Sequence, residues 1–332
     1  MGFSIGVVVG AAMNLLMQIW KMAQYGFQYR PIIHLQHPGI KKFFLLFLPV
    51  VLGLSVNELN LLVSQYLGSG LGEGVLSSLK NAQRIMMLPV GIFAAAIGLS
   101  VFPTMTSHVA CGEFEEYKQN LTMGLRTILF ITLPASAGLM VLSYPVVRAM
   151  YFQFAVTEES IAQISVLLIF YCLGIIGYSA QQILNRGFYA VEDTKSPVTI
   201  NMFVLLSNIG ISILLVQPFG ASGLALAYSI SGLLSMAVLG ICLRRKIGPY
   251  GGKALWKSAI QSFMASVIMG IAVWLTAQGL EQGLDMSYKA AQIGQVLVSV
   301  GVGTVVYTVM VLFLRMEEAQ TVVRIVKRKL HR

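Results

Sequence analysis

Residues 81–104 read NAQRIMMLPVGIFAAAIGLSVFPT, an apolar run long enough to cross a lipid bilayer as one helix. Runs of similar length occur at about 3–20, 43–66, 126–147, 161–184, 198–216, 222–243, 258–277 and 291–314. Lipid offers the backbone no hydrogen-bond partners, so each span must be helical. The sequence therefore predicts an all-α polytopic membrane bundle of about nine transmembrane helices, with a turn at QPFGASG, residues 217–223, between the sixth and seventh.

The composition supports a membrane protein. The chain has 332 residues, of which 56% are hydrophobic and only 11% are charged. Soluble domains carry about 25% charged residues. The formal net charge of +10 could indicate a nucleic-acid partner, so the positions of the basic residues decide its meaning.

The basic residues alternate with the predicted spans. Most of the 23 fall in the segments 21–42, 105–126, 185–197 and 244–257 or after residue 314, whereas the intervening loops hold only Arg148 and Lys289. This distribution follows the positive-inside rule and predicts an N-terminus outside and a C-terminus inside. Topology thus accounts for the charge, and we expect no nucleic-acid partner.

The predicted spans and loops divide the chain into four segments. Residues 1–42 hold a partial first span and a basic inside loop, residues 43–245 the core bundle, residues 246–314 two additional spans, and residues 315–332 a basic tail. The tail sequence TVVRIVKRKLHR has helical spacing of apolar residues and predicts an amphipathic helix on anionic inner-leaflet lipids, the alternative being a solvated tail. The stretch CGEFEEYKQNL at 111–121 predicts a short surface helix on the same side.

Polar residues within the second and third spans mark the candidate site. A charged side chain facing lipid costs about 2.5–3.5 kcal/mol on insertion scales, so such residues are expected to face a cavity or a ligand. Lys80 lies one turn before Arg84 at the outer end of the third span. The candidate substrate-binding residues are Arg84, Asn81, Asn57, Asn60, Glu58 and Lys80.

Arg84 admits three readings. A guanidinium in a wet cavity would bind phosphate or pyrophosphate through two parallel hydrogen bonds. Alternatively, Arg84 pairs with Glu58 and simply joins two helices, or it snorkels to the headgroups. Pro89 and Gly91 predict a break in the same helix, which suits a protein that rocks between two states but is also found in static membrane helices.

Signals for catalysis are weak. The four histidines lie outside the predicted spans, and the sequence contains no phosphate-binding glycine loop, nucleophile elbow or metal-ligand spacing. We therefore expect a protein that is not an enzyme and that needs no cofactor or metal.

Three segments carry a family resemblance: NAQRIMMLPVGIFAAAIGLSVFPTMT at 81–106, GEFEEYKQNLTMGLRTILFITLPASAGL at 112–139 and LNRGFYAVEDTKSPV at 184–198. They resemble the MviN/MurJ family of lipid II flippases, within the multidrug/oligosaccharidyl-lipid/polysaccharide exporter superfamily. The resemblance implies the C-terminal part of a fourteen-helix transporter, with the N-terminal lobe missing from this chain or supplied separately. It also places Arg84 at the position of a functionally important arginine of the family.

The resemblance implies that the protein flips undecaprenyl-pyrophosphate-linked peptidoglycan precursor, lipid II, from the inner to the outer leaflet of the bacterial plasma membrane by alternating access. One alternative is a flippase for another lipid-linked polysaccharide or a cation-coupled drug exporter. Another is a non-transporting membrane scaffold or an inactive fragment, which would bury Arg84 against Glu58 with no cavity beside it.

Overall fold

The computed structural model describes residues 2–24, 40, 62–63, 65–151 and 157–318. All regular elements in these ranges are helical. They are α1 Gly2–Gln24, α3 Val75–Pro89, η1 Val90–Ala94, α4 Ala95–Ala110, α5 Phe114–Val141, α6 Ser143–Tyr151, α7 Glu158–Cys172, α8 Ile175–Ala190, α9 Lys195–Ile247, α10 Gly252–Gly283 and α11 Lys289–Phe313. Helix α1 belongs to a unit of residues 1–50, separate from the unit of residues 51–332 that holds α3 to α11.

Helices α3 and α4 form the third predicted span and are separated by η1, a five-residue π-helical segment that starts directly after Pro89. Proline has no N–H to donate and its ring crowds the preceding turn, so the regular hydrogen-bond ladder cannot continue through it. Single π-helical turns of this kind relieve such a defect within a helix. The break that Pro89 and Gly91 predicted is thus present, within a helical rod of 36 residues, Val75–Ala110.

The prediction of a separate surface helix at 111–121 is wrong. Helix α4 ends in a reversal at Gly112, whose φ is +77°, and there the Glu113 N–H donates to the His108 carbonyl at 2.8 Å. Helix α5 then starts at Phe114 and runs without interruption for 28 residues. The acidic pair Glu115 and Glu116 occupies its first turn, where negative charge favours the helix N-terminus.

The fifth predicted span consists of α7 and α8, which are bent by 45° at the break between Cys172 and Ile175. The glycine in that break is required by packing. A Cβ at Gly174 would lie 2.9 Å from Cα of Ser229 on α9, so the two chain segments touch at their backbones.

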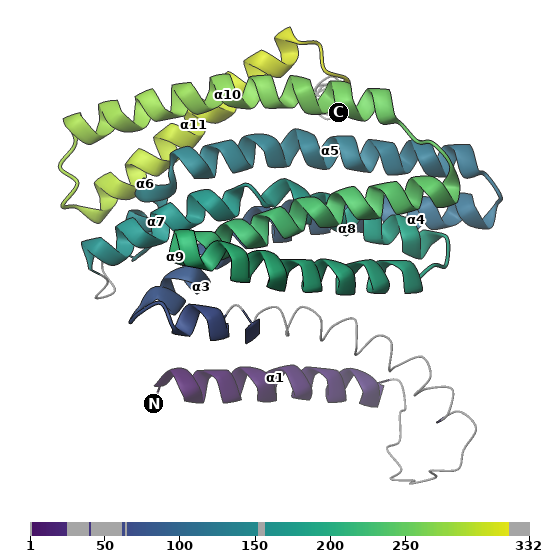
Figure 1. The fold of residues 1–332 in the computed structure, drawn as a ribbon, viewed down its shortest axis with the longest axis horizontal. Coiled ribbons are helices and arrows are strands. Elements are labelled where there is room, and N and C mark those ends of the chain that lie inside the picture. The colour runs from purple at the N-terminus through teal and green to yellow at the C-terminus, as the bar shows by residue number, and fades with distance from the viewer. Residues whose placement is uncertain (1, 25–39, 41–61, 64, 152–156, 319–332) are drawn as a thin grey trace. The chain divides into compact units, whose positions relative to one another are not determined.

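Helix α9 is a hairpin of two helical arms rather than a single rod. Gly220 has φ 56° and ψ −131°, which interrupts the helix inside the sequence QPFGASG. The arms then run antiparallel, since Asn208 donates to Ser231 at 2.9 Å and a Cβ at Gly223 would lie 2.1 Å from the Leu215 carbonyl oxygen. Figure 1 shows both arms. The predicted turn between the sixth and seventh spans is confirmed.

The described residues hold five helices that are long and apolar enough to cross a membrane, or six if α7 and α8 form one span. With α9 divided at Gly220, the predicted spans from the third to the ninth each coincide with a helix, a helix arm or a broken helix pair. The second predicted span, residues 43–66, lies mostly outside the described residues, so the total of nine stays a prediction.

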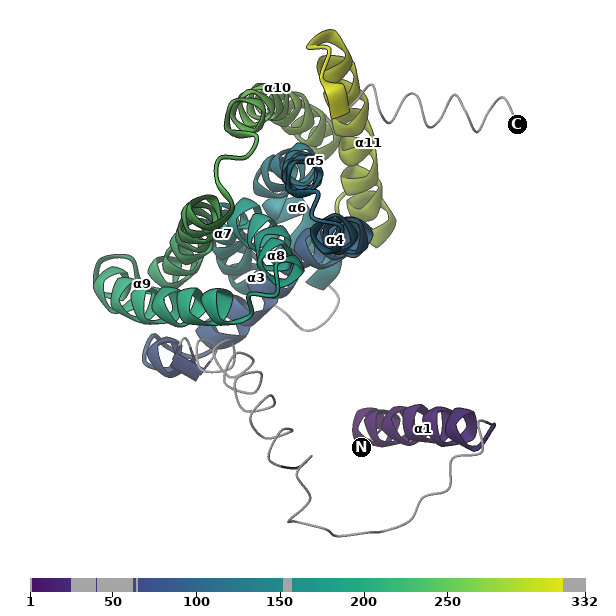
Figure 2. The same ribbon diagram turned by 90° about the vertical axis from the view of Figure 1, so that its right-hand side faces the viewer.

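Buried side chains form three apolar clusters. One joins α3, α6, α7 and the turn of α9. A second joins α4, α5, α8 and both outer parts of α9. A third joins α10 and α11, and partly buried residues of α5 pack against it. We call the part of the bundle near the α4–α5 and α9–α10 connections the basic end, after Lys118, Arg126, Lys246 and Lys253. These connections lie to the right in Figure 1, the side that faces the viewer in Figure 2.

Candidate functional site

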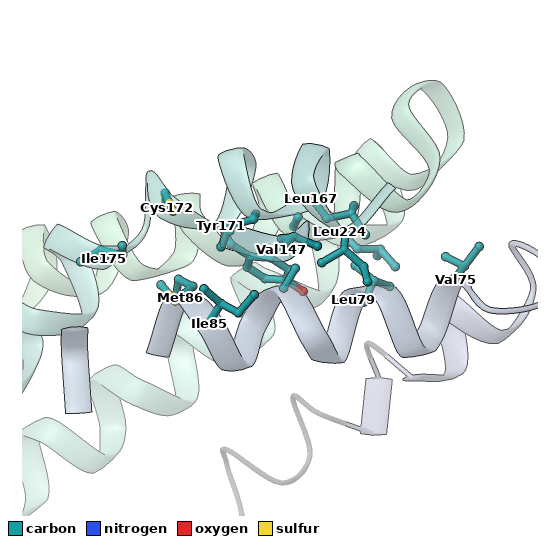
Figure 3. Packing of buried hydrophobic residues seen from close by; sticks show 14 of the residues in the cluster. Val75, Leu79, Ile85, Met86, Val147, Leu167, Tyr171, Cys172, Ile175 and Leu224 are labelled. Atoms are coloured by element: carbon teal, nitrogen blue, oxygen red, sulfur yellow. The ribbon is translucent and has the colours of Figure 1, made fainter. Parts of the chain in front are cut away.

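Helix α3 presents one face to the first apolar cluster. It starts after Gly74, whose φ is +80°, and buries side chains at helical spacing. Figure 3 shows them pointing toward α6, α7 and α9 from one side of the helix; they include Val75, Leu79, Ile85 and Met86. The rotation of α3 about its axis is therefore fixed by packing.

Arg84 lies on the other face of α3 and is exposed. Leu88 and Gly91, one and two turns further along, are exposed as well, whereas Lys80 and Asn81, one turn earlier, are half-buried. The charge of Arg84 acts on the Tyr151 hydroxyl at the end of α6, opposite the basic end. The structure thus places three predicted site residues together on one face.

Two polar contacts hold the buried side of α3 in place. Ser78 donates to the Gln163 side chain on α7 at 2.9 Å, and Gln83 is hydrogen-bonded to Tyr228 on α9. The Tyr228 ring stacks on Tyr178 with centroids 4.5 Å apart. These contacts orient the helix, so the direction in which Arg84 points follows from residues that do not touch it.

The other predicted site residues, Asn57, Glu58 and Asn60, lie outside the described residues. The proposed pairing of Glu58 with Arg84, and the shared polar face of the second span, therefore stay predictions. No segment that the structure describes covers Arg84, whose side chain is exposed.

The segment FYAVEDTKSPV, residues 188–198, builds the turn between α8 and α9. Glu192 adopts φ 59° and ends α8, and the Asp193 carboxylate then accepts from the Ser196 N–H at 2.9 Å and from its hydroxyl at 2.6 Å. Lys246 at the end of α9 pairs with the same carboxylate. Burial would raise the pKa of Asp193, but these hydrogen bonds outweigh it and hold the pKa at about 2.

Arg186, in the same motif region, packs on a helix backbone. A Cβ at Gly98 of α4 would lie 2.4 Å from the Arg186 Nη1 atom, so only glycine leaves room for this guanidinium. Nη1 is buried and has no hydrogen-bond partner among the described residues. Residues 184–198 thus contribute to the packing of α8 against α4 and to the turn between α8 and α9.

Ion pairs fasten the hairpin of α10 and α11 at both of its ends. At the basic end, Arg126 pairs with Glu317 and Glu318 at 2.8 Å each, and Ser258 donates to Glu318 at 2.8 Å. At the opposite end, Arg148 donates to Glu281 at 3.2 Å and to Gln295 at 3.0 Å. Sequence reasoning treated Arg126 and Arg148 only as topology markers, because their partners are distant in the chain.

Comparison with known proteins agrees with this architecture. The family described as Lipid II flippase MurJ matches residues 1–293. The chain belongs to this family. The resemblance predicted from residues 81–106, 112–139 and 184–198 is thus confirmed, and the family is one of membrane transporters rather than enzymes.

Two curated MurJ relatives illustrate the extent of the match. The probable lipid II flippase of Vibrio cholerae is 30% identical over 277 residues, which cover 82% of this chain and 52% of the relative. That of Thermotoga maritima is 30% identical over 323 residues, covering 97% of this chain and 61% of the relative. The chain thus spans about half to three-fifths of the length of these MurJ proteins.

Solved structures place the fold in the same group. A lipid II flippase MurJ in an inward closed conformation superposes with a TM-score of 0.73 and 26% identity, covering 90% of this chain and 59% of that one. An outward-facing MATE family multidrug transporter of the MOP superfamily gives a TM-score of 0.51 at 15% identity, covering 82% and 65%. The second likeness concerns the fold alone.

Proposed function

We propose that the protein moves lipid II from the inner to the outer leaflet of the bacterial plasma membrane by alternating access, with its N-terminus outside and its C-terminus inside. Membership of the MurJ family supports this proposal. The observation that carries it is the exposed guanidinium of Arg84 on a membrane helix whose opposite face is buried. A cation kept in this setting needs a polar partner, and a pyrophosphate headgroup supplies one.

In this proposal Arg84 binds the pyrophosphate through two parallel hydrogen bonds, a geometry that a lysine cannot reproduce. Lys80 adds a second positive charge one turn away, and Asn81 adds an amide that can donate to phosphate or sugar oxygens. Asn57, Asn60 and Glu58 of the second span complete the proposed site. Affinity must stay moderate, because the cargo has to leave on the other side.

The break at η1 fits a helix that changes shape during transport. It begins six residues after Arg84, about 9 Å further along the helix axis. A change of bend there would move the site relative to the basic end. Broken helices beside a binding site are a recurring feature of transporters.

The proposal is tested by complementation. Because the chain spans about half of the Vibrio cholerae relative, these 332 residues replace the matching part of that relative in a strain depleted of its own flippase. We expect growth with the wild-type chimera, loss of growth with Arg84→Ala, and at best weak growth with Arg84→Lys. Lys253→Ala, an exposed basic residue at the start of α10, is the control and should support growth.

Each variant is first checked for its amount in the membrane by immunoblot. Normal growth of Arg84→Ala at wild-type levels would show that the guanidinium does not bind cargo. Failure of the wild-type chimera, with the parent relative growing normally, would favour another lipid-linked polysaccharide or a drug as the cargo. The proposed contact of the basic tail with anionic inner-leaflet lipids concerns residues outside the described part and is not probed by these variants.

A further inference from the structure

A cavity of about 640 Å³ lies at the basic end, away from the α3 site. Three segments that are distant in sequence line it: residues 115–131 of α5, residues 249–251 between α9 and α10, and Glu317 and Glu318 after α11. Lys80, Asn81 and Arg84, the predicted substrate-binding residues that the structure describes, do not line it. Its volume falls within the range of about 300–1,000 Å³ that is usual for ligand sites.

The α5 wall of the cavity begins with charged residues and ends with apolar ones, with Arg126 between them. Its lining on α5 runs from Lys118 through Met123 to Phe130 and Ile131. Lys118 and Ile131 are thirteen residues apart, which corresponds to about 20 Å along a helix. One leaflet of a bilayer, headgroups included, is about 20 Å thick. An amphiphile aligned with α5 would therefore place its headgroup beside Lys118 and an acyl chain beside Phe130.

Both signs of charge line the cavity, at two levels about 12 Å apart along α5, because Lys118 and Arg126 are separated by eight residues. Lys118 pairs with Glu115 at 2.7 Å, and Arg126 pairs with Glu317 and Glu318 at 2.8 Å. The two cations are mostly covered, with 16% and 19% of their side chains exposed, whereas Glu115 and Glu317 are 75% exposed. The carboxylates are thus the accessible groups, and the cations lie behind them.

This pattern favours a headgroup that carries an ammonium as well as a phosphate. An ammonium beside Lys118 can donate its N–H groups to the exposed Glu115 carboxylate, while the phosphate lies near Lys118. A purely anionic headgroup would meet the carboxylates first and be repelled. A quaternary ammonium has no N–H to donate, so choline would bind less well than ethanolamine.

We propose that this cavity binds one phospholipid with an ethanolamine headgroup, which packs against α5 and against the two segments that flank the hairpin of α10 and α11, residues 249–251 and 317–318. The site is separate from the proposed cargo site and uses different residues. The connection between α9 and α10 packs closely on α5 at one side of the cavity, since a Cβ at Gly251 would lie 2.1 Å from Cγ2 of Thr122. The lipid would thus add a third link beside the ion pairs that already fasten the hairpin to α5 and α6.

Native mass spectrometry of the delipidated chain in detergent tests the proposal. The chain is titrated separately with phosphatidylethanolamine, phosphatidylcholine and phosphatidylglycerol of identical acyl chains. We expect one tightly bound phosphatidylethanolamine, with the other two lipids binding at least about fivefold more weakly, the scale of one exposed charged contact. Equal binding of phosphatidylglycerol or phosphatidylcholine, or no retained lipid, would overturn the proposal.

Variants locate the bound lipid. Thr127→Trp fills the apolar part of the cavity and should remove the tight binding event, whereas Leu99→Trp, at a 68% exposed position of α4, should leave it unchanged. Lys118→Ala should weaken binding several-fold, with Lys253→Ala as its matched control. If Thr127→Trp does not elute as a folded protein, Met123→Trp, at an exposed position of the same wall, decides instead. Tight binding that survives cavity filling would refute the site.

These measurements involve no transport. Loss of the lipid site would leave the proposed flippase function untouched, and failure of complementation would leave the lipid site untouched. The two proposals therefore fail by different results.

Discussion

Gly177 is the point at which α8 and the second arm of α9 come closest. A Cβ at Gly177 would lie 2.3 Å from the carbonyl carbon of Gly232, 2.5 Å from its oxygen and 2.5 Å from the Leu233 nitrogen. All three are backbone atoms, so no change of side-chain rotamer can make room. Small residues at such crossings let membrane helices pack at their backbones.

We therefore expect Gly177→Ala to force the two helices apart. Ordinary contacts need about 3.5–4.0 Å between carbon atoms, so the local separation must increase by more than 1 Å. That movement weakens the neighbouring contacts, including the packing of Gly232 against the Tyr178 ring. Overpacking of this kind costs about 1–3 kcal/mol. The gain in helix propensity from Gly to Ala, about 1 kcal/mol, does not offset it.

The assay is thermal unfolding of the purified chain in detergent, followed by circular dichroism. Gly210→Ala is the matched control, because Gly210 lies inside the first arm of α9 and a Cβ there would meet no atom within 4 Å. We expect Gly210→Ala to melt at or above the wild-type temperature and Gly177→Ala clearly below it. If both variants melt together, the close approach of α8 and α9 does not determine stability.

Two further predictions concern charged groups outside the spans. Because the pKa of Asp193 is lowered to about 2, its pairing with Lys246 stabilises the fold above about pH 4, and this stabilisation is lost as the pH falls from there toward 2. Asp193→Asn should therefore flatten the dependence of the melting temperature on pH between about pH 4 and 2. An unchanged slope in the variant would contradict this prediction. Arg148→Met should lower the melting temperature more than Glu281→Gln. The Arg148 variant leaves the buried Gln295 oxygen unpaired at a cost of about 1–3 kcal/mol, whereas the ion pair with Glu281, which is 47% exposed, contributes less. The reverse order of melting temperatures would show that the ion pair dominates.

The lengths of the apolar runs predicted most of the helices, because the thickness of a bilayer sets how many apolar residues a spanning helix needs. The apolar runs between residues 81 and 314 all coincide with helices. Pro89 correctly indicated the π-helical break, and the sequence QPFGASG correctly indicated the hairpin turn. The prediction of a separate surface helix at 111–121 is wrong because the charged residues of this stretch are typical of a solvent-exposed segment. They belong to α5, whose continuation depends on the buried Tyr117 and Leu121 of the second cluster.

The site could be predicted only where its members are close in sequence. Lys80, Asn81 and Arg84 share a helix, so their common face followed from spacing alone. The cavity at the basic end was not predicted, since Lys118 and Tyr250 are separated by more than a hundred residues and meet only after α5 to α10 have packed. Charge patterning identified such residues as lying on one side of a membrane but gave no information about which of them meet.

The two broken helices lie at the boundary between the first and second apolar clusters. Val90 at the start of η1 belongs to the first cluster and Ala94 at its end to the second. The other broken pair repeats this division, with Ile175 in the first cluster and Ala180 in the second, and α8 packs against η1. Arg84 is carried by the part of α3 that packs in the first cluster, whereas the ion pairs at the basic end belong to helices of the second and third. A change of angle at these two breaks would therefore displace the proposed cargo site relative to the ion pairs at the basic end. Because Arg148 of α6 joins the first cluster to the other end of the hairpin, the same change would act on its contacts with Glu281 and Gln295.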